Sequence, residues 1–136
     1  MTRFKPVTTA LLIGVIMACT TTPATEEAVT LATRQTDGVT VAASKRGTLV
    51  VQDGCLRFRG ESGGMFMIVW PEGTVFRQGP PATVTDPRGA TRRLGELVEI
   101  QGGGASPENF DPATNPGNVI RRCGGGPVFL ADSFVE

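Results

Sequence analysis

Short runs of alternating apolar and polar residues dominate the chain from residue 47 onward. Residues 47–52 are rich in β-branched side chains, Asp53-Gly54 follows, and residues 55–59 alternate between apolar and basic side chains. An Asp-Gly pair between two such runs is typical of a β-hairpin with a two-residue turn. We therefore expect a hairpin over residues 47–59. Its candidate core residues are Leu49, Val51, Leu56 and Phe58.

Further apolar runs, separated by Gly- and Pro-rich turns, predict more strands. Residues 65–70 are apolar throughout, as in a strand buried on both faces. Residues 96–100 alternate, and we expect Leu97 to face inward together with Val98 or Ile100. Shorter runs are found at residues 74–76, 82–85 and 128–131.

The spacing of these runs predicts an all-β fold, because no window after the first 18 residues has a convincing helical period. A domain of about 90 residues with one core favours a small five- to six-stranded barrel of the OB type, closed or partly open. A small β-sandwich is the alternative. Cys55, Trp70 and Cys123 occur in the Cys-Trp-Cys order of immunoglobulin-like domains, although few strands fit between them.

Residues 102–118 are expected to form a long loop, either functional or disordered, because glycines open it and three prolines interrupt any strand pairing. We expect no helix of three or more turns after Gly47. Ser106-Pro107-Glu108 is the place best suited to a single helical turn. Phe110 is the one bulky apolar residue of the loop, so we expect it to pack on the barrel.

The start of the chain has the anatomy of a secretory signal. Arg3 and Lys5 precede an apolar run at residues 10–18, which is too short for a transmembrane helix, and small Ala18 precedes Cys19. Residues 16–19, Ile-Met-Ala-Cys, resemble the lipobox of bacterial lipoproteins. The resemblance implies that residues 1–18 are a signal peptide and that Cys19 is acylated as the mature N-terminus. A plain secretory signal with a chance cysteine is the alternative reading.

The lipobox resemblance also implies a location and a domain order. Acyl chains on Cys19 would bind membrane lipid and hold the folded part outside the cytoplasm. Thr20 resembles the residue that sorts lipoproteins to the outer membrane, facing the periplasm, in a host with two membranes. We expect a lipidated N-terminus and flexible tether over residues 19–46, and the β-barrel domain over residues 47–136.

Cysteine counting predicts a disulfide once Cys19 is assigned to the lipid anchor. The chain has three cysteines, and an exported protein tends to pair them. Cys55 and Cys123 then remain, and neither has the spacing or the neighbours of a redox motif or a zinc site. We expect a structural disulfide between them.

Composition and charge argue against several functional classes. The chain has no histidine, which is the commonest general base and zinc ligand. Without residues 1–18 it has 11 basic and 13 acidic residues, so nothing favours nucleic acid as a partner. We expect no catalytic residues, no cofactor and no metal. An enzyme that uses carboxylates such as Asp53 or Asp111 is a weaker alternative.

Two other patterns have ordinary structural explanations. The glycine runs at 102–104 and 124–126 lack the neighbours of a phosphate-binding loop, so we read them as turns. Oxygen-bearing side chains in the expected loop are the kind that Ca²⁺ binds, but the calcium-loop spacing is absent and Asx turns explain them equally well. These residues are Glu108, Asn109, Asp111, Asn115 and Asn118.

Three groups of basic side chains stand out along the chain. If the barrel brought them together, they would suit an anionic polymer or a lipid headgroup, whereas separately they are ordinary surface charge. These side chains are Arg57 with Arg59, Arg92 with Arg93, and Arg121 with Arg122.

Three short segments resemble a β domain of small bacterial lipoproteins: residues 54–57, residues 69–71 and residues 123–124. This resemblance implies a fold and an export route, and no activity. We therefore expect a lipid-anchored, non-catalytic protein of the cell envelope with a binding or interaction module for an envelope protein or polymer. A purely structural envelope lipoprotein is the alternative.

Overall fold

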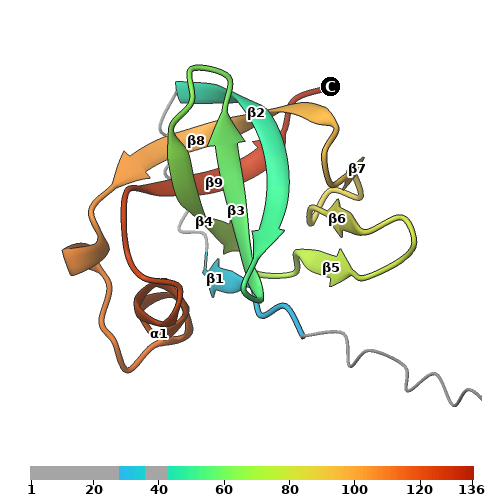
Figure 1. The fold of residues 1–136 in the computed structure, drawn as a ribbon. Helices are drawn as coiled ribbons and strands as arrows, with labels where there is room; N and C mark the ends of the chain where they lie inside the picture. The colour runs from blue at the N-terminus through green and yellow to red at the C-terminus, as the bar shows by residue number, and fades with distance from the viewer. Residues whose placement is uncertain (1–27, 36–42) are drawn as a thin grey trace, which may run out of the picture.

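The computed structural model describes residues 28–35 and 43–136, which form a β-barrel, a second small sheet and one α-helix (Figure 1). The predicted signal peptide and Cys19 lie outside the described residues. The elements in chain order are β1 (Ala32–Arg34), β2 (Ala43–Gln52), β3 (Cys55–Gly60), β4 (Met65–Pro71), β5 (Val75–Arg77), β6 (Thr83–Thr85), β7 (Thr91–Arg93), β8 (Leu97–Ala105), η1 (Pro107–Asn109), α1 (Asn115–Arg122) and β9 (Val128–Phe134).

Five strands close into a barrel. Strand β2 pairs antiparallel with β3 and β8, β3 pairs antiparallel with β4, and β8 pairs antiparallel with β9. Closure comes from the parallel pairing of β4 with β9. The order β2-β3-β4-β9-β8 around the barrel is that of an OB-type fold, so the predicted fold class is confirmed. The short strand β1 adds to β4 outside this ring.

The predicted β2–β3 hairpin is confirmed in both position and turn. Gln52 lies opposite Cys55, and the two turn residues have positive φ angles of 51° at Asp53 and 74° at Gly54. Positive φ at both positions is the requirement of a type I′ turn, which explains why Asp-Gly is placed there. Three of the four candidate core residues are buried, namely Leu49, Leu56 and Phe58.

Two residues expected in the core are exposed instead. Val51 is 39% exposed because β8 pairs with β2 only as far as Thr48, so the hairpin tip lacks a neighbouring strand on that side. Leu97 is 50% exposed, while Val98 and Ile100 are buried. Alternation puts Val98 and Ile100 on the inner face of β8, so Leu97 falls on the outer face.

The barrel interior is an aromatic core. Trp70 of β4 and Phe134 of β9 have ring centroids 5.6 Å apart, and Phe58 and Phe129 are buried beside them in the same cluster. The run at residues 65–70 is divided by alternation: Ile68 and Trp70 belong to this inner cluster, whereas Met67 and Val69 belong to a second cluster outside the barrel wall. The prediction of a strand buried on both faces is therefore correct.

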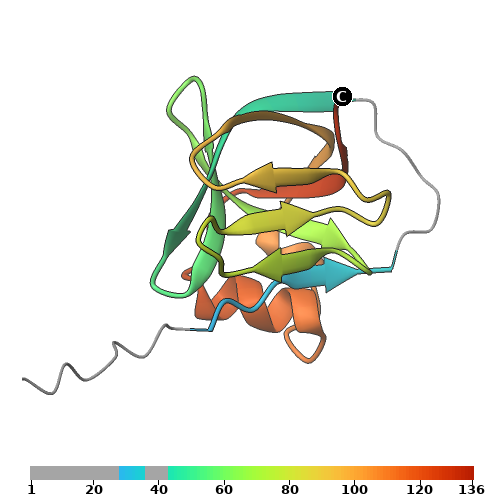
Figure 2. The same ribbon diagram turned by 90° about the vertical axis from the view of Figure 1, so that its right-hand side faces the viewer.

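The small sheet is an antiparallel meander of β5, β6 and β7 that covers one side of the barrel (Figure 2). Val84 of β6 is fully buried in the barrel core, and Phe76 and Leu94 pack against the same cluster. The carboxylate of Asp86 accepts backbone N–H groups from Arg88 and Ala90 in the β6–β7 turn and from Phe134 in β9. Asp86 therefore fastens the small sheet to the last strand of the barrel.

The expectation of a loop over residues 102–118 is wrong at both ends. Residues Gly102–Ala105 continue β8 and pair with Val128–Ala131 of β9 after a bulge at Gln101/Gly102. A Cβ atom on Gly102 would overlap the carbonyl oxygen of Leu130, so glycine is needed where the two backbones approach closely. The glycine run is therefore a strand rather than a loop.

The other end of the expected loop is helical. Helix α1 has eight residues, fewer than the three turns that the sequence argued against, with Pro116 in its first turn and Arg121 and Arg122 in its last. Val119 and Ile120 are buried against the outside of the barrel, so tertiary packing stabilises a helix with weak local propensity. Phe110 packs against the same outer cluster, as predicted.

The folded part begins earlier than residue 47. Strand β1 lies inside the segment expected to be a tether, and β2 begins at Ala43. Ala32 is buried and pairs with Val69, so this short segment is held by strand pairing and by apolar contact. The boundary predicted at residue 47 is thus corrected, because the alternation before Gly47 is too weak to identify these strand residues from sequence.

Substituting Gly102 tests the close approach of β8 and β9. We expect Gly102→Ala to lower the free energy of unfolding by about 1–3 kcal/mol, as overpacking does. Gly104→Ala is the matched control, since a Cβ there has no atom within 4 Å, and we expect it to cost less than about 0.5 kcal/mol. Urea unfolding followed by tryptophan fluorescence measures both. Equal losses would mean that the close approach does not constrain residue 102.

Removing the Asp86 carboxylate tests the attachment of the small sheet. Asp86→Ala leaves three backbone N–H groups without their acceptor, and we expect a loss of at least about 2 kcal/mol in the free energy of unfolding. Glu96→Ala, which removes one exposed carboxylate acceptor from the N–H of Arg93, serves as the control, with an expected loss below about 1 kcal/mol. Thermal unfolding of both variants gives the comparison.

Candidate functional site

OB-type barrels bind ligands on the face of their second and third strands and on two adjoining loops. The corresponding strands here are β3 and β4, and the part of their outer face around Met67 and Val69 is covered. Met67 and Val69 of β4 contact a cluster that includes Val119 and Ile120 of α1, and all four side chains are at most 3% exposed. Helix α1 thus occupies the place where such barrels bind a ligand.

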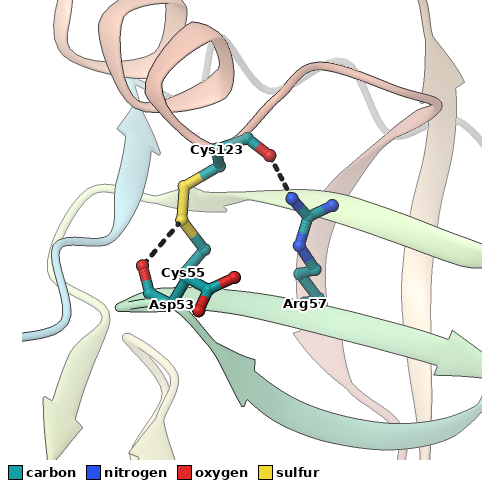
Figure 3. Close-up of a disulfide and its surroundings, with 4 residues drawn as sticks. All are labelled: Asp53, Cys55, Arg57 and Cys123. Carbon is teal, nitrogen blue, oxygen red and sulfur yellow. Dashed lines mark hydrogen bonds between the residues drawn. A yellow bond between two sulfur atoms is a disulfide. The ribbon is translucent and has the colours of Figure 1, made fainter.

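The predicted disulfide fastens α1 to this face (Figure 3). Cys55 is the first residue of β3 and Cys123 is the C-cap of α1, and their Cα atoms are 5.9 Å apart, within the range expected for a bonded pair. The pairing of Cys55 with Cys123 is confirmed. Arg57, two residues along β3, donates a guanidinium hydrogen bond to the carbonyl oxygen of Cys123. The sequence predicted the pair but gave no sign that it holds a helix.

Strand β1 secures the other side of α1. The backbone N–H of Thr33 donates to Oδ1 of Asn115, the first residue of the helix, over 2.7 Å. Arg34 forms an ion pair of 3.0 Å with Asp132 of β9. Helix α1 is therefore held by a disulfide, by the hydrogen bond between Asn115 and β1 and by a buried apolar cluster, and it covers Met67 and Val69 on the outer face of β4.

The three groups of arginines are only partly brought together. Arg57 contacts the end of α1 next to Arg121 and Arg122, so these side chains share one side of the molecule. Arg92 and Arg93 lie on β7 in the small sheet and face opposite ways. Arg92 turns inward, where it donates to the carbonyl oxygen of Val135 and lies over the ring of Phe134. A single basic surface made of all three groups is therefore not formed.

The carboxylates and candidate calcium ligands named in the sequence lie in turns, in the short helix η1 and in the contact between α1 and β1. Asp53 is in the β2–β3 turn, and Asp111 closes an Asx turn by accepting the N–H of Ala113. The side chain of Asn115 accepts the backbone N–H of Thr33 in β1, and Glu108 and Asn109 belong to η1. Within the described ranges, no group of three or more His, Cys, Asp or Glu side chains is placed to hold a metal ion.

The side chain of Lys45, near the start of β2, lies over two aromatic rings. The ammonium group of Lys45 lies 4.3 Å from the ring centroid of Phe66 and 5.7 Å from that of Phe129. A hollow of about 410 Å³ lies beside it, and its lining includes both Arg46 and the carboxylates Glu61 and Glu99. Because the two signs of charge are mixed, this hollow favours no class of charged ligand.

The outer face of the small sheet is more distinctive. Arg77, Thr83 and Arg93 lie opposite one another on β5, β6 and β7, and form one row across the sheet. The next row consists of Val75, Thr85 and Thr91, with the hydroxyl oxygens of the two threonines 2.8 Å apart. A hollow of about 850 Å³ opens on this face. Its lining residues are Pro81, Thr83, Thr91, Arg93, Leu94 and Glu96.

Sequence reasoning missed this face because it did not single out Arg77. The strand alternation of each short run contains the signal, since residues two apart share a face. What it lacks is the register between β5, β6 and β7, which depends on turns that local pattern does not define.

Comparisons with protein families, with curated proteins and with solved structures found no significant match to this chain. Among the helices of the described residues, none is long and apolar enough to span a membrane.

Removing the disulfide tests how strongly it holds α1. We expect the double variant Cys55→Ala/Cys123→Ala to lose about 2–5 kcal/mol in the free energy of unfolding. The unmodified chain in a dithiol reductant is the control and should lose a similar amount, whereas reductant should not affect the double variant. Urea unfolding with and without reductant provides the readout. A variant as stable as the unmodified oxidised chain would show that packing alone holds the helix.

Proposed function

We propose that the chain is a lipid-anchored, non-catalytic protein of the cell envelope, held to membrane lipid by acylated Cys19. The observation that carries the proposal is the pairing of Cys55 with Cys123. Of the three cysteines, this leaves Cys19 as the one without a disulfide partner in the chain. That cysteine stands at the end of the lipobox-like residues 16–19, where acylation would use it.

The disulfide also supports an extracytoplasmic location. Structural disulfides persist in oxidising compartments and are rare in the cytoplasm. A lipid anchor and a stabilised small barrel suit a protein that works at the membrane surface outside the cytoplasm. In a host with two membranes, Thr20 favours the outer membrane, with the barrel facing the periplasm.

The barrel domain serves in this proposal as an interaction module, for an envelope surface, polymer or protein. Support comes from the small sheet, whose outer face presents Arg77 and Arg93 on either side of Thr83. Within residues 28–35 and 43–136, the only ion pair joins Arg34 and Asp132, so both of these guanidinium groups are left without a carboxylate partner. Unpaired arginines on one face favour an interaction role over a purely structural one.

Metabolic labelling with a palmitate analogue tests the anchor. We expect the unmodified chain to incorporate the label and fractionate with membranes, and Cys19→Ser to do neither. The variant Cys55→Ala/Cys123→Ala is the matched control, because it removes two cysteines but keeps the lipobox, and it should still be labelled. Mass spectrometry that found an unmodified Cys19 on the processed protein would contradict the proposal.

A further inference from the structure

We propose that the outer face of the small sheet, defined by Val75, Arg77, Thr83, Thr85, Thr91 and Arg93, docks on an anionic phospholipid surface. The inference rests on the proposed lipid anchor, because it assigns the face that turns toward the membrane in which Cys19 would be held. It goes further by naming residues that contact headgroups.

The small sheet carries an excess of positive charge. Residues 75–94 contain four arginines and a single acidic residue, although the chain as a whole is neutral. That acidic residue, Asp86, is 3% exposed and bonds three backbone N–H groups. Its charge is therefore directed into the fold, so positive charge exceeds negative charge at the surface formed by residues 75–94.

The spacing of two arginines across the small sheet also suits a membrane surface. Arg77 and Arg93 stand on the two outer strands with Thr83 between them, so their backbones are two strand spacings apart, about 10 Å. Two exposed arginines on one face, with the hydroxyl group of Thr83 in the row between them, suit phosphate oxygens presented on a plane. Glu96 is the acidic group at this site, and its Oε2 accepts the backbone N–H of Arg93 over 3.1 Å.

The length of chain between Cys19 and β1 limits how far the barrel can lie from the proposed anchor. Strand β1 begins 13 residues after Cys19, and the covalent reach of that length is at most about 45 Å. The carbonyl oxygen of Arg34, at the end of β1, accepts the N–H of Glu72, just before β5. Val29 and Leu31 pack on the cluster that also takes Phe76 of β5. An anchor at Cys19 therefore holds the whole barrel within this reach of the membrane, so a weak affinity of the small sheet for lipid is enough.

Other surfaces fit an anionic membrane less well. The hollow beside Lys45 is lined by two glutamates. Arg57 is engaged by the carbonyl oxygen of Cys123, so α1 presents only Arg121 and Arg122. Figure 1 places α1 and the small sheet on different sides of the barrel, so these two arginines supply a matched control with the same change of charge.

Vesicle sedimentation tests the proposal with the processed chain, residues 19–136, carrying Cys19→Ser so that no acyl chain contributes. Every contact described above lies within these residues. We expect binding to vesicles in which about a third of the lipid is phosphatidylglycerol, weak binding to phosphatidylcholine alone, and a decline with salt. We expect Arg77→Gln/Arg93→Gln to weaken binding to the anionic vesicles by roughly 30-fold, since each arginine contributes about fivefold.

Control variants distinguish binding through this face from a general effect of net charge. Arg121→Gln/Arg122→Gln should change binding less than about threefold, and Arg77→Lys/Arg93→Lys should retain most of it, because an ammonium still binds headgroups as a point charge. Circular dichroism confirms that each variant is folded. Equal losses in both glutamine pairs, or equal binding to the two vesicle types, would overturn the proposal. Binding to soluble polyphosphate but not to vesicles would overturn it as well, and would assign the face to an anionic polymer.

Because Cys19 is absent from this assay, its result is independent of the palmitate labelling. Failure of labelling would remove the anchor, whereas failure of vesicle binding would remove the docking face, so the two proposals can fail separately.

Discussion

The pairing of β9 with two strands at once is the constraint on which this structure depends. Strand β9 pairs parallel with β4 and antiparallel with β8, and so closes the barrel. It also carries Phe129 and Phe134 into the core and offers the backbone N–H that Asp86 binds from the small sheet. The two pairings are compatible because Gly102 has no side chain at the point where β8 approaches Leu130.

Closure leaves the outer wall of β4 apolar, and the fold covers that wall with α1 and β1. The helix is short and has weak propensity, so it depends on Val119, Ile120 and the disulfide from Cys123 to Cys55 for its position. Covering this wall stabilises the domain and at the same time occupies the surface that OB-type barrels use for ligands.

The small sheet presents a different face to solvent. Its inner side chains Phe76 and Val84 pack in the barrel core, so the alternate residues of each strand face outward. Arg77 and Arg93 are thereby presented on the outer face, while Arg92, the neighbour of Arg93 on β7, is turned inward onto Phe134. The proposed anchor and the proposed docking face would act together, with the acyl chains supplying affinity and the arginines supplying orientation.

Features that depend on near neighbours could be predicted from the sequence. The β2–β3 hairpin follows from a turn that requires positive φ at Asp53 and Gly54, and the strands follow from alternation of period two. The Cys55–Cys123 pair followed from counting, once the lipobox reserved Cys19. Contacts between distant segments were decided by the tertiary structure. A glycine run is a strand at 102–104 only because β9 lies against it, and residues 115–122 are a helix only because the barrel wall buries one side. The row formed by Arg77 and Arg93 likewise exists only through the register of three strands, which no local pattern encodes.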